Sequence, residues 1–372
     1  MKKALAETSN EPDVSLDPRE RAEVERSLAE LRAGRPIRFE PHAGPTQLVF
    51  STEELEPEAL DEAVAQRAGQ SVAEPILLIT AARARHLGLE GAKGRTAALS
   101  ARGLSAQEIA RLADPTRPAL AGALPRLLQD PPYAESILEL VKAARLLPAA
   151  VILAAQGQSD VPRVDEAAVQ RFRDHAASRL TQVAEAKVPL LGADETRIVA
   201  FRPSDGGREH LAIIIGEPDR GRPVLTRLHS ECFTGDLLRS LRCDCGDQLR
   251  GAIELMSREG AGLLLYLAQE GRGIGLVNKL RAYALQDRGA DTLDANEELG
   301  FDADERVYLP AAEMLRQLEI AQIRLLTNNP LKVEALAACG VNVVARVPHS
   351  FPANCHSKAY LETKAKRFGH LL

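Results

Sequence analysis

Short apolar runs alternate with longer segments of helical periodicity through the second half of the chain. The apolar runs predict strands at residues 197–201, 211–216, 223–228, 262–267, 323–326 and 341–345. The segments between them predict helices at residues 248–259, 276–288, 311–318 and 330–339. A continuous apolar run such as 262–267 is typical of a strand covered on both faces. The pattern therefore predicts an α/β (mixed α+β) fold, in which ligands bind at the carboxyl ends of the strands.

The first half of the chain is less regular. A helix is predicted at residues 19–33, because Asp17 can cap it, Pro18 suits its first turn and Gly34 can end it. Further strands are predicted at 47–50, 75–80 and 151–155, and further helices at 81–87, 135–145 and 166–184. The segment Gly157-Gln-Ser-Asp-Val-Pro162 is typical of a linker. We therefore expect a flexible leader at 1–18, a first domain at 19–160 and a second domain at 161–372.

The composition is that of a soluble globular protein, with 45% hydrophobic and 27% charged residues. A net charge of −5 gives no general attraction to nucleic acid or to an anionic membrane. No stretch approaches the roughly eighteen apolar residues of a membrane span, and the polar leader lacks the apolar segment of an export signal. All five cysteines follow residue 230, which argues against a disulfide framework. We therefore expect a cytoplasmic protein with reduced thiols and with no nucleic-acid or membrane partner.

Three of the cysteines, Cys232, Cys243 and Cys245, fall within fourteen residues. Thiolates at this spacing favour Zn²⁺, and three protein ligands with one open position are typical of catalytic zinc. The alternative is three buried, apolar cysteines, but Asp244 between two of them is poor material for a core. The cysteines therefore predict metal-assisted hydrolysis.

Two polar residues precede the first cysteine. His229 and Glu231 either orient a metal-bound water or supply a further ligand. A histidine at this position is equally consistent with the capping of a turn, so the sequence leaves its role open.

Two further clusters follow predicted strands. In Gln269-Glu-Gly-Arg-Gly-Ile-Gly275, the glycines permit close backbone approach to a ligand and Arg272 suits a phosphate. In Leu326-Thr-Asn-Asn-Pro-Leu-Lys332, Thr327 and Lys332 flank a capped helix start that exposes free amides. Each has a plain alternative, a tight strand-to-helix turn for the first and an ordinary capped helix for the second.

A fourth cluster lies in a predicted loop. Asp304 and Arg306 are two residues apart, so in an extended stretch both side chains point to the same side. A surface ion pair is the ordinary explanation for such neighbours. Tyr283, in the predicted helix at 276–288, is by default a half-buried packing residue.

Taken in this order, the clusters resemble the GTP cyclohydrolase II family of riboflavin biosynthesis, over residues 183–372. The resemblance is carried by His-Ser-Glu-Cys-x-Thr-Gly-Asp, Arg-Cys-Asp-Cys-Gly, Gln-Glu-Gly-Arg-x-Ile-Gly, Lys-x-Arg-Ala-Tyr-x-Leu-Gln-Asp, Leu-Gly-Phe-x-x-Asp-Glu-Arg, Leu-Leu-Thr-Asn-Asn-Pro-x-Lys and a closing Gly-His-Leu-Leu. It implies the GTP cyclohydrolase II fold for the second domain and a homodimeric enzyme.

The resemblance also implies a reaction. A zinc-activated water would attack C8 of GTP and open the imidazole ring, with Mg²⁺ on the phosphates. Formate and pyrophosphate would leave, giving 2,5-diamino-6-ribosylamino-4(3H)-pyrimidinone 5′-phosphate. One Zn²⁺ in each subunit would be held by Cys232, Cys243 and Cys245.

The remaining roles are assigned by the same resemblance. Asp304 would be the proton acceptor, Arg306 the nucleophile toward the α-phosphate, and Tyr283 would assist at the ring. The residues expected to contact GTP are Arg227, Leu228, His229, Ser230, Glu231, Gln248, Glu270, Gly271, Arg272, Thr292, Thr327 and Lys332.

The first domain is similar, more faintly, to 3,4-dihydroxy-2-butanone 4-phosphate synthase at residues 29–37, 75–89 and 134–153. The acidic metal loop of that enzyme corresponds here to residues 39–48, where Glu40 is the one carboxylate. Its Gly-His-Thr-Glu signature is replaced by Pro132-Tyr-Ala-Glu135. We expect a degenerate domain without synthase activity, kept for dimerisation or stability.

The sequence leaves other functions open. A related zinc hydrolase could act on another nucleotide in pyrimidine catabolism, although Gln248, Tyr283 and Thr292 argue against a changed guanine pocket. A GTP-binding regulator without catalysis is disfavoured by the intact cysteines together with Asp304 and Arg306. An enzyme that keeps both activities would need the missing acidic loop. Cys355 and His356, in a segment shorter than in many relatives, have no assigned role.

Overall fold

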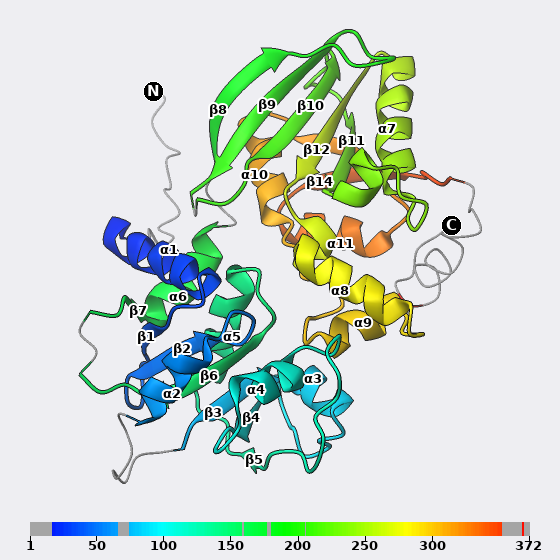
Figure 1. Cartoon of the computed structure of the whole chain (residues 1–372). Helices are drawn as coiled ribbons and strands as arrows, with labels where there is room; N and C mark the ends of the chain where they lie inside the picture. Colours follow the sequence, from blue (N-terminus) through cyan, green and yellow to red (C-terminus); the bar gives the residue numbers. More distant parts are fainter. Residues whose placement is uncertain are drawn as a thin grey trace, which may run out of the picture.

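The computed structural model describes residues 17–65, 74–157, 160–176, 180–204, 206–351 and 367. Nearly all of the predicted leader, together with Cys355 and His356, lies outside these residues. The described residues form two seven-stranded sheets, one in each half of the chain and both flanked by helices (Figure 1). The predicted mixed α/β fold with two domains is therefore confirmed.

The first sheet has the strand order β5-β4-β3-β6-β2-β1-β7, and its pairs are antiparallel except β1 with β7. Its strands are β1 (Ile37–Glu40), β2 (Gln47–Ser51), β3 (Ile76–Thr80), β4 (Thr96–Ser100), β5 (Leu127–Leu128), β6 (Ala149–Ala154) and β7 (Arg163–Asp165). Its helices are α1 (Pro18–Arg32), α2 (Pro57–Ala65), α3 (Ala81–His86), α4 (Ala106–Ala113), α5 (Ala134–Ala143) and α6 (Glu166–Ala176).

Side-chain alternation along the strands gives this sheet two cores. Leu78 packs with residues of α1, α5 and α6 on one face. Its neighbours Leu77 and Ile79 pack with residues of α2, α3 and α4 on the other face. Because both faces are covered, β3 and β6 are almost entirely apolar, which is why they could be recognised in the sequence.

The second sheet has the strand order β14-β13-β11-β12-β10-β9-β8. Its strands are β8 (Leu180–Lys187), β9 (Thr196–Pro203), β10 (His210–Gly216), β11 (Val224–Ser230), β12 (Ala261–Leu267), β13 (Gln322–Leu326) and β14 (Asn342–Val347). The helical elements are η1 (Phe233–Leu237), α7 (Cys245–Glu259), η2 (Glu270–Gly273), α8 (Leu276–Gln286), α9 (Thr292–Glu298), α10 (Leu309–Gln317) and α11 (Pro330–Ala338). Strands β12, β11, β13 and β14 run parallel, and the pairs from β12 to β8 are antiparallel.

The predicted elements agree with these bounds to within a few residues, with one exception. The predicted helix at 166–184 is wrong at its end, because α6 stops at Ala176 and β8 begins at Leu180. Residues 180–187 pair with β9 along its length, and this tertiary pairing overrides their helix-favouring composition. As the last strand of the sheet, β8 is exposed at every position after Leu180, so the buried pattern holds only for the central strands.

The two halves of the chain are in direct contact. Strand β7 pairs with β1, and α6 contacts α1 and α5, so the first sheet and its helices continue past the predicted boundary at residue 160. Helices α8 and α9 lie between the two sheets (Figure 1). Leu147 from the first half is buried among Ile274, Ala282, Leu285 and Phe301 of the second.

Within the described ranges, no helix has both the length and the apolar character that a membrane crossing requires.

Candidate active site

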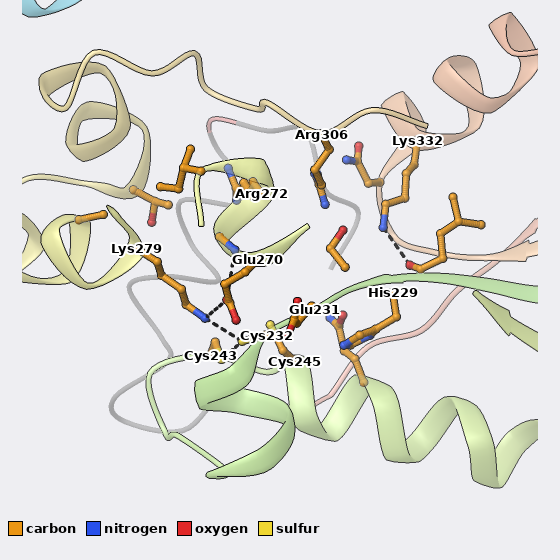
Figure 2. Close-up of a pocket in the computed structure, with 18 of the residues that line it drawn as sticks. His229, Glu231, Cys232, Cys243, Cys245, Glu270, Arg272, Lys279, Arg306 and Lys332 are labelled. Atoms are coloured by element: carbon orange, nitrogen blue, oxygen red, sulfur yellow. Dashed lines mark hydrogen bonds and ion pairs between the residues drawn. The ribbon is translucent and has the colours of Figure 1, made fainter. Parts of the chain in front are cut away.

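The carboxyl ends of three parallel strands meet at one edge of the second sheet. Strand β11 pairs in parallel with β12 on one side and with β13 on the other. The polar segments that follow these strands, at residues 230–232, 270–272 and 327–332, line one pocket together with residues of α7 and α8 (Figure 2). The sequence clusters are therefore brought together by the topology of the sheet.

The structure places the predicted site residues in this pocket with one exception. Those that line it are Arg227, Leu228, His229, Ser230, Glu231, Cys232, Cys243, Cys245, Gln248, Glu270, Gly271, Arg272, Tyr283, Thr292, Arg306, Thr327 and Lys332. Asp304 does not line the pocket and instead binds a residue that does, Arg306. Thr292, which was assigned no element, is the first residue of α9.

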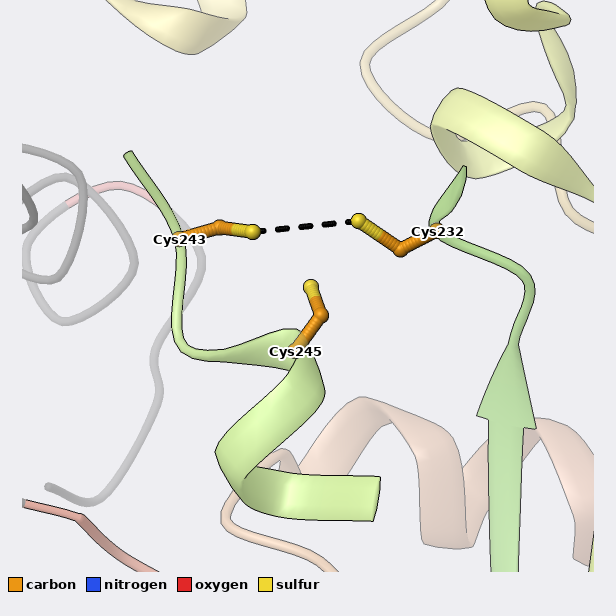
Figure 3. A group of neighbouring side chains, drawn as sticks. All are labelled: Cys232, Cys243 and Cys245. Carbon is orange, nitrogen blue, oxygen red and sulfur yellow. Dashed lines mark hydrogen bonds between the residues drawn. The ribbon is translucent and has the colours of Figure 1, made fainter. Parts of the chain in front are cut away.

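The three cysteine side chains point toward one another (Figure 3). Cys232 follows β11, and Cys245 is the first residue of α7. The Sγ atoms of Cys232 and Cys243 are 3.7 Å apart, and the three sulfurs lie within 4.8 Å of one another. Zinc–sulfur bonds of about 2.3 Å at tetrahedral angles place sulfurs roughly 3.8 Å apart. The donor set therefore fits Zn²⁺ in type, number and spacing.

A lysine and a glutamate complete the wall beside these thiols. Lys279 Nζ donates to Cys232 Sγ at 3.0 Å and to Glu270 Oε1 at 2.7 Å (Figure 2). Glu270 Oε2 accepts from the backbone N–H of Phe233 at 2.6 Å. Hydrogen bonds from the thiols of Cys243 and Cys245, together with the Lys279 ammonium, lower the pKa of Cys232. Hydrogen bonds with Cys232 and burial raise the pKa values of Cys243 and Cys245, so the site by itself favours one thiolate, the form that binds metal, at Cys232.

Asp236 connects the backbone at Cys232 to side chains of strands β11 and β12. Its carboxylate accepts hydrogen bonds from Cys232 N at 2.9 Å, His229 Nε2 at 3.0 Å and the Tyr266 hydroxyl at 2.9 Å. Burial lowers the pKa of His229, which favours the neutral ring with its proton on Nε2. His229 therefore forms part of the pocket wall and does not cap a turn. Its buried Nδ1 has no hydrogen-bond partner among the described residues.

Gly235 lies against the thiols in a position that only glycine fits. A Cβ atom there would be 2.8 Å from Cys243 Sγ, closer than real Cβ contacts come, and 3.0 Å from Cys232 Sγ, which is unusually tight. The Gly235 N–H also donates to Cys232 Sγ at 3.3 Å. The glycine is therefore required by the packing of the cysteines.

Gly235→Ala is expected to lower the affinity for zinc about ten- to hundredfold, the range typical of residues that support metal ligands, because the added methyl group pushes the sulfurs apart. Competition with a chromophoric chelator measures the change. Gly221→Ala is the matched control, because a Cβ there meets only the Asp219 carboxylate, at 3.2 Å in an exposed turn. Equal zinc affinity in the two variants would contradict the argument.

Three further cationic residues lie away from the thiols. Figure 2 shows Arg272, Arg306 and Lys332 on the side of the pocket opposite the three cysteines. Gly271 and Arg272 both have left-handed backbone, at φ 63° and 65°, which turns the segment sharply after β12. Such a conformation is costly for arginine and is typical of functional sites. Lys332 Nζ donates to Leu228 O at 3.1 Å, which holds the ammonium over the end of β11.

Arg306 is held by Asp304. Its Nε donates to Asp304 Oδ1 at 2.7 Å, its Nη2 reaches Oδ2, and its side chain is only 13% exposed. Burial opposes ionisation of Asp304, but the hydrogen bonds and charge of Arg306 outweigh it and lower the pKa of this carboxyl. The pair therefore differs from an ordinary surface ion pair, because its arginine lines the pocket.

Sequence reasoning missed several residues of this site, among them Gly235, Asp236 and Lys279, which act on the cysteines or His229, and His349, which lines the pocket. The first three stand in motifs that were recognised, Gly235 and Asp236 in Thr-Gly-Asp and Lys279 at the start of Lys-x-Arg-Ala-Tyr. These motifs could have drawn attention to the three residues. Their roles, however, depend on contacts with His229, Tyr266 and the cysteines, which become close only when the chain folds.

Comparison with known proteins places this site in a family. Residues 181–348 match the family model described as GTP cyclohydrolase II. A GTP cyclohydrolase-2 from Azospirillum brasilense is 52% identical over 363 residues, which cover 94% of this chain and 93% of that protein. A GTP cyclohydrolase-2 from Actinobacillus succinogenes is 50% identical over 196 residues, which cover 52% of this chain and 89% of that protein.

The solved structures offer a weaker likeness. A two-domain 3,4-dihydroxy-2-butanone 4-phosphate synthase from A. baumannii is 17% identical and covers 87% of this chain and 99% of that chain, with a TM-score of 0.33. This score does not establish a shared fold, so the synthase-like character of the first half stays a prediction. The Azospirillum match, in contrast, extends over nearly the whole of both proteins. The chain therefore belongs to the GTP cyclohydrolase II family of hydrolases.

Proposed function

We propose that this chain hydrolyses GTP with opening of the imidazole ring. The products are formate, pyrophosphate and 2,5-diamino-6-ribosylamino-4(3H)-pyrimidinone 5′-phosphate, in the first step of riboflavin biosynthesis. The observation that carries the proposal is the convergence of a three-thiol cluster and three cationic side chains on one pocket. A hydrolytic centre and an anion site are what a reaction on a nucleoside triphosphate requires.

Cys232, Cys243 and Cys245 would hold one Zn²⁺ in each subunit. When bound, zinc supplies a water acidified toward neutral pH. The protein residues prepare the position. Lys279 offsets the excess negative charge of three thiolates, and Asp236 fixes the backbone of Cys232 and the ring of His229. His229 and Glu231 line the same pocket, where the Glu231 carboxylate would accept a hydrogen bond from a water or a purine N–H.

The opposite side of the pocket would bind the triphosphate and its Mg²⁺. Arg272, Arg306 and Lys332 supply positive charge, and Thr327 lies beside the amino end of α11, where the helix dipole favours an anion, although the predicted free amides are absent because those of Leu331 and Lys332 already donate to Asn329. This arrangement directs the base toward the thiols. Arg306 would act on the α-phosphate with Asp304 as proton acceptor, a role that its lowered pKa suits.

The purine would lie between these two groups. Gln248 is fixed at the end of the pocket because its Oε1 accepts from Arg227 Nη2 at 2.6 Å. Tyr283 is held near the thiols, with the Arg242 guanidinium 4.6 Å from its ring centroid and its hydroxyl 3.5 Å from that of Thr234. Both side chains are therefore oriented toward a flat, hydrogen-bonding ligand.

The test is to incubate the zinc-loaded protein with GTP and Mg²⁺ and to measure formate and pyrophosphate together. Equal amounts of both, lost on chelation, are expected. Pyrophosphate without formate would contradict ring opening. Turnover of another nucleotide in place of GTP would indicate the related pyrimidine hydrolase, and tight GTP binding without products would indicate a regulator. The homodimer is a separate proposal, tested by sedimentation.

A further inference from the structure

Helix α8 presents two different faces. Lys279, Tyr283 and Gln286 line the pocket. Asn278, Arg281 and Leu285, at the same helical spacing on the adjoining face, contact residues of the first half of the chain. One helix therefore carries pocket residues on one side and the contact with the first domain on the other.

Arg281 is bound by two carboxylates of the first half. It lies 3.0 Å from Glu53 Oε2 and 3.3 Å from Asp114 Oδ2. The side chains of Glu53 and Asp114 are only 9% and 8% exposed, and that of Arg281 is 18% exposed. The adjacent loop adds two contacts, because Arg288 donates to the carbonyls of Pro115 and Thr116 at 3.2 and 3.0 Å. Removing one partner of such a buried ion pair is strongly destabilising, because it leaves the other charge buried without compensation.

The network continues from Arg281 to the segment after β12. Arg281 Nη1 donates to Asn278 Oδ1 at 2.7 Å. Asn278, fully buried, donates to Ile274 O at 3.0 Å and to Arg145 O at 3.3 Å. Arg145 of the first half, whose backbone is left-handed at φ 61°, reaches Ala268 O at 3.4 Å. The first half thus contacts both ends of the segment that carries Glu270, Gly271 and Arg272.

We infer that Glu53 and Asp114 are positioning residues for the reaction in the second half of the chain. They fix α8 through Arg281, and α8 in turn holds Lys279 at the thiols and Tyr283 in the pocket. The inference rests on the proposed function and gives the first half a role that requires no chemistry of its own. Matches such as the Actinobacillus protein, 89% of which aligns with 52% of this chain, show that a similar domain also occurs in proteins with little other sequence.

The test uses the full chain loaded with zinc. Glu53→Gln keeps the oxygen that accepts from Leu147 N and removes the charge that binds Arg281. Asp114→Asn removes the second charge that binds Arg281. Each of these two variants is expected to lower kcat about tenfold or more, while KM for GTP changes less than about threefold. This split is expected because Arg272, Arg306 and Lys332, the side chains proposed to bind the phosphates, lie outside α8.

Asp130→Asn is the matched control. Asp130 is also a carboxylate of the first half, and it accepts from Thr96 Oγ1 at 2.6 Å and Ala98 N at 2.7 Å, both on β4 of the first sheet. It is expected to lower the melting temperature without changing kcat. Arg281→Lys, which keeps the charge, is expected to retain more activity than Arg281→Gln.

Hydrogen–deuterium exchange of residues 276–286 gives a reading that does not depend on catalysis. Exchange is expected to accelerate in Glu53→Gln and Asp114→Asn and to stay unchanged in Asp130→Asn. Unchanged exchange and kcat in both test variants would overturn the inference. If exchange accelerates but the wild-type protein releases no formate from GTP, the proposed function fails while the anchoring of α8 by the first half stands.

Discussion

Cys243→Ser is expected to lower zinc affinity by more than about a hundredfold and to abolish formate release from GTP. A serine hydroxyl is a poor ligand for zinc near neutral pH, and two thiolates alone leave the ion bound mainly by solvent. The loss should exceed that of Gly235→Ala, because a supporting residue typically changes metal affinity only ten- to hundredfold. Zinc content and the thiolate absorption of the cobalt-substituted protein measure binding independently of turnover.

Cys339→Ser is the control for this experiment. Cys339 is a half-buried thiol at the end of α11 and does not line the pocket. Its replacement is expected to leave zinc content and turnover unchanged. A Cys243→Ser protein that kept one zinc and full activity would show that the cluster of Cys232, Cys243 and Cys245 is not the catalytic centre.

The central strands of both sheets could be predicted because each is a short run of apolar residues that can be recognised in the sequence. Strand β12 is apolar along its length, since Leu264 faces one core and Leu263 and Leu265 face the other. The edge strand β8 carries no such signal, and its pairing with β9 decides its conformation. The prediction failed where pairing with a neighbouring strand, rather than the apolar pattern of the segment itself, fixes the backbone.

The same distinction applies to the site. The cysteines and the segments after β12 and β13 were recognised because their chemistry lies within a few residues. The partner of Asp236, Tyr266, is thirty positions away, and Glu53 and Arg281 are 228 positions apart (281 − 53). Arg281 in particular would ordinarily be expected on the solvent-exposed face of a helix, because arginine is a charged residue. Only the packing of the two halves shows that it is bound by buried carboxylates.

Arg306→Ala is expected to lower kcat for GTP about a hundredfold or more, with zinc content unchanged. An arginine that contacts developing charge typically contributes two to three orders of magnitude to turnover. Arg306→Lys keeps the charge but loses the planar fork that binds Asp304 through two nitrogens, so it should recover only part of the activity. Equal kcat in the wild-type and alanine proteins would exclude Arg306 from the reaction.

The pH profile of this variant tests Asp304 separately. In the wild-type protein Arg306 lowers the pKa of Asp304 against the opposing effect of burial, so the carboxylate is an available proton acceptor well below neutral pH. Without the Arg306 side chain, its charge and its side-chain hydrogen bonds are lost, so burial raises that pKa relative to the wild-type protein and protonation removes the acceptor at a higher pH. The acid limb of kcat/KM in Arg306→Ala should therefore move to higher pH, and the acid limb should vanish in Asp304→Asn. An acid limb that stays in place in both variants would assign the proton acceptor to another group.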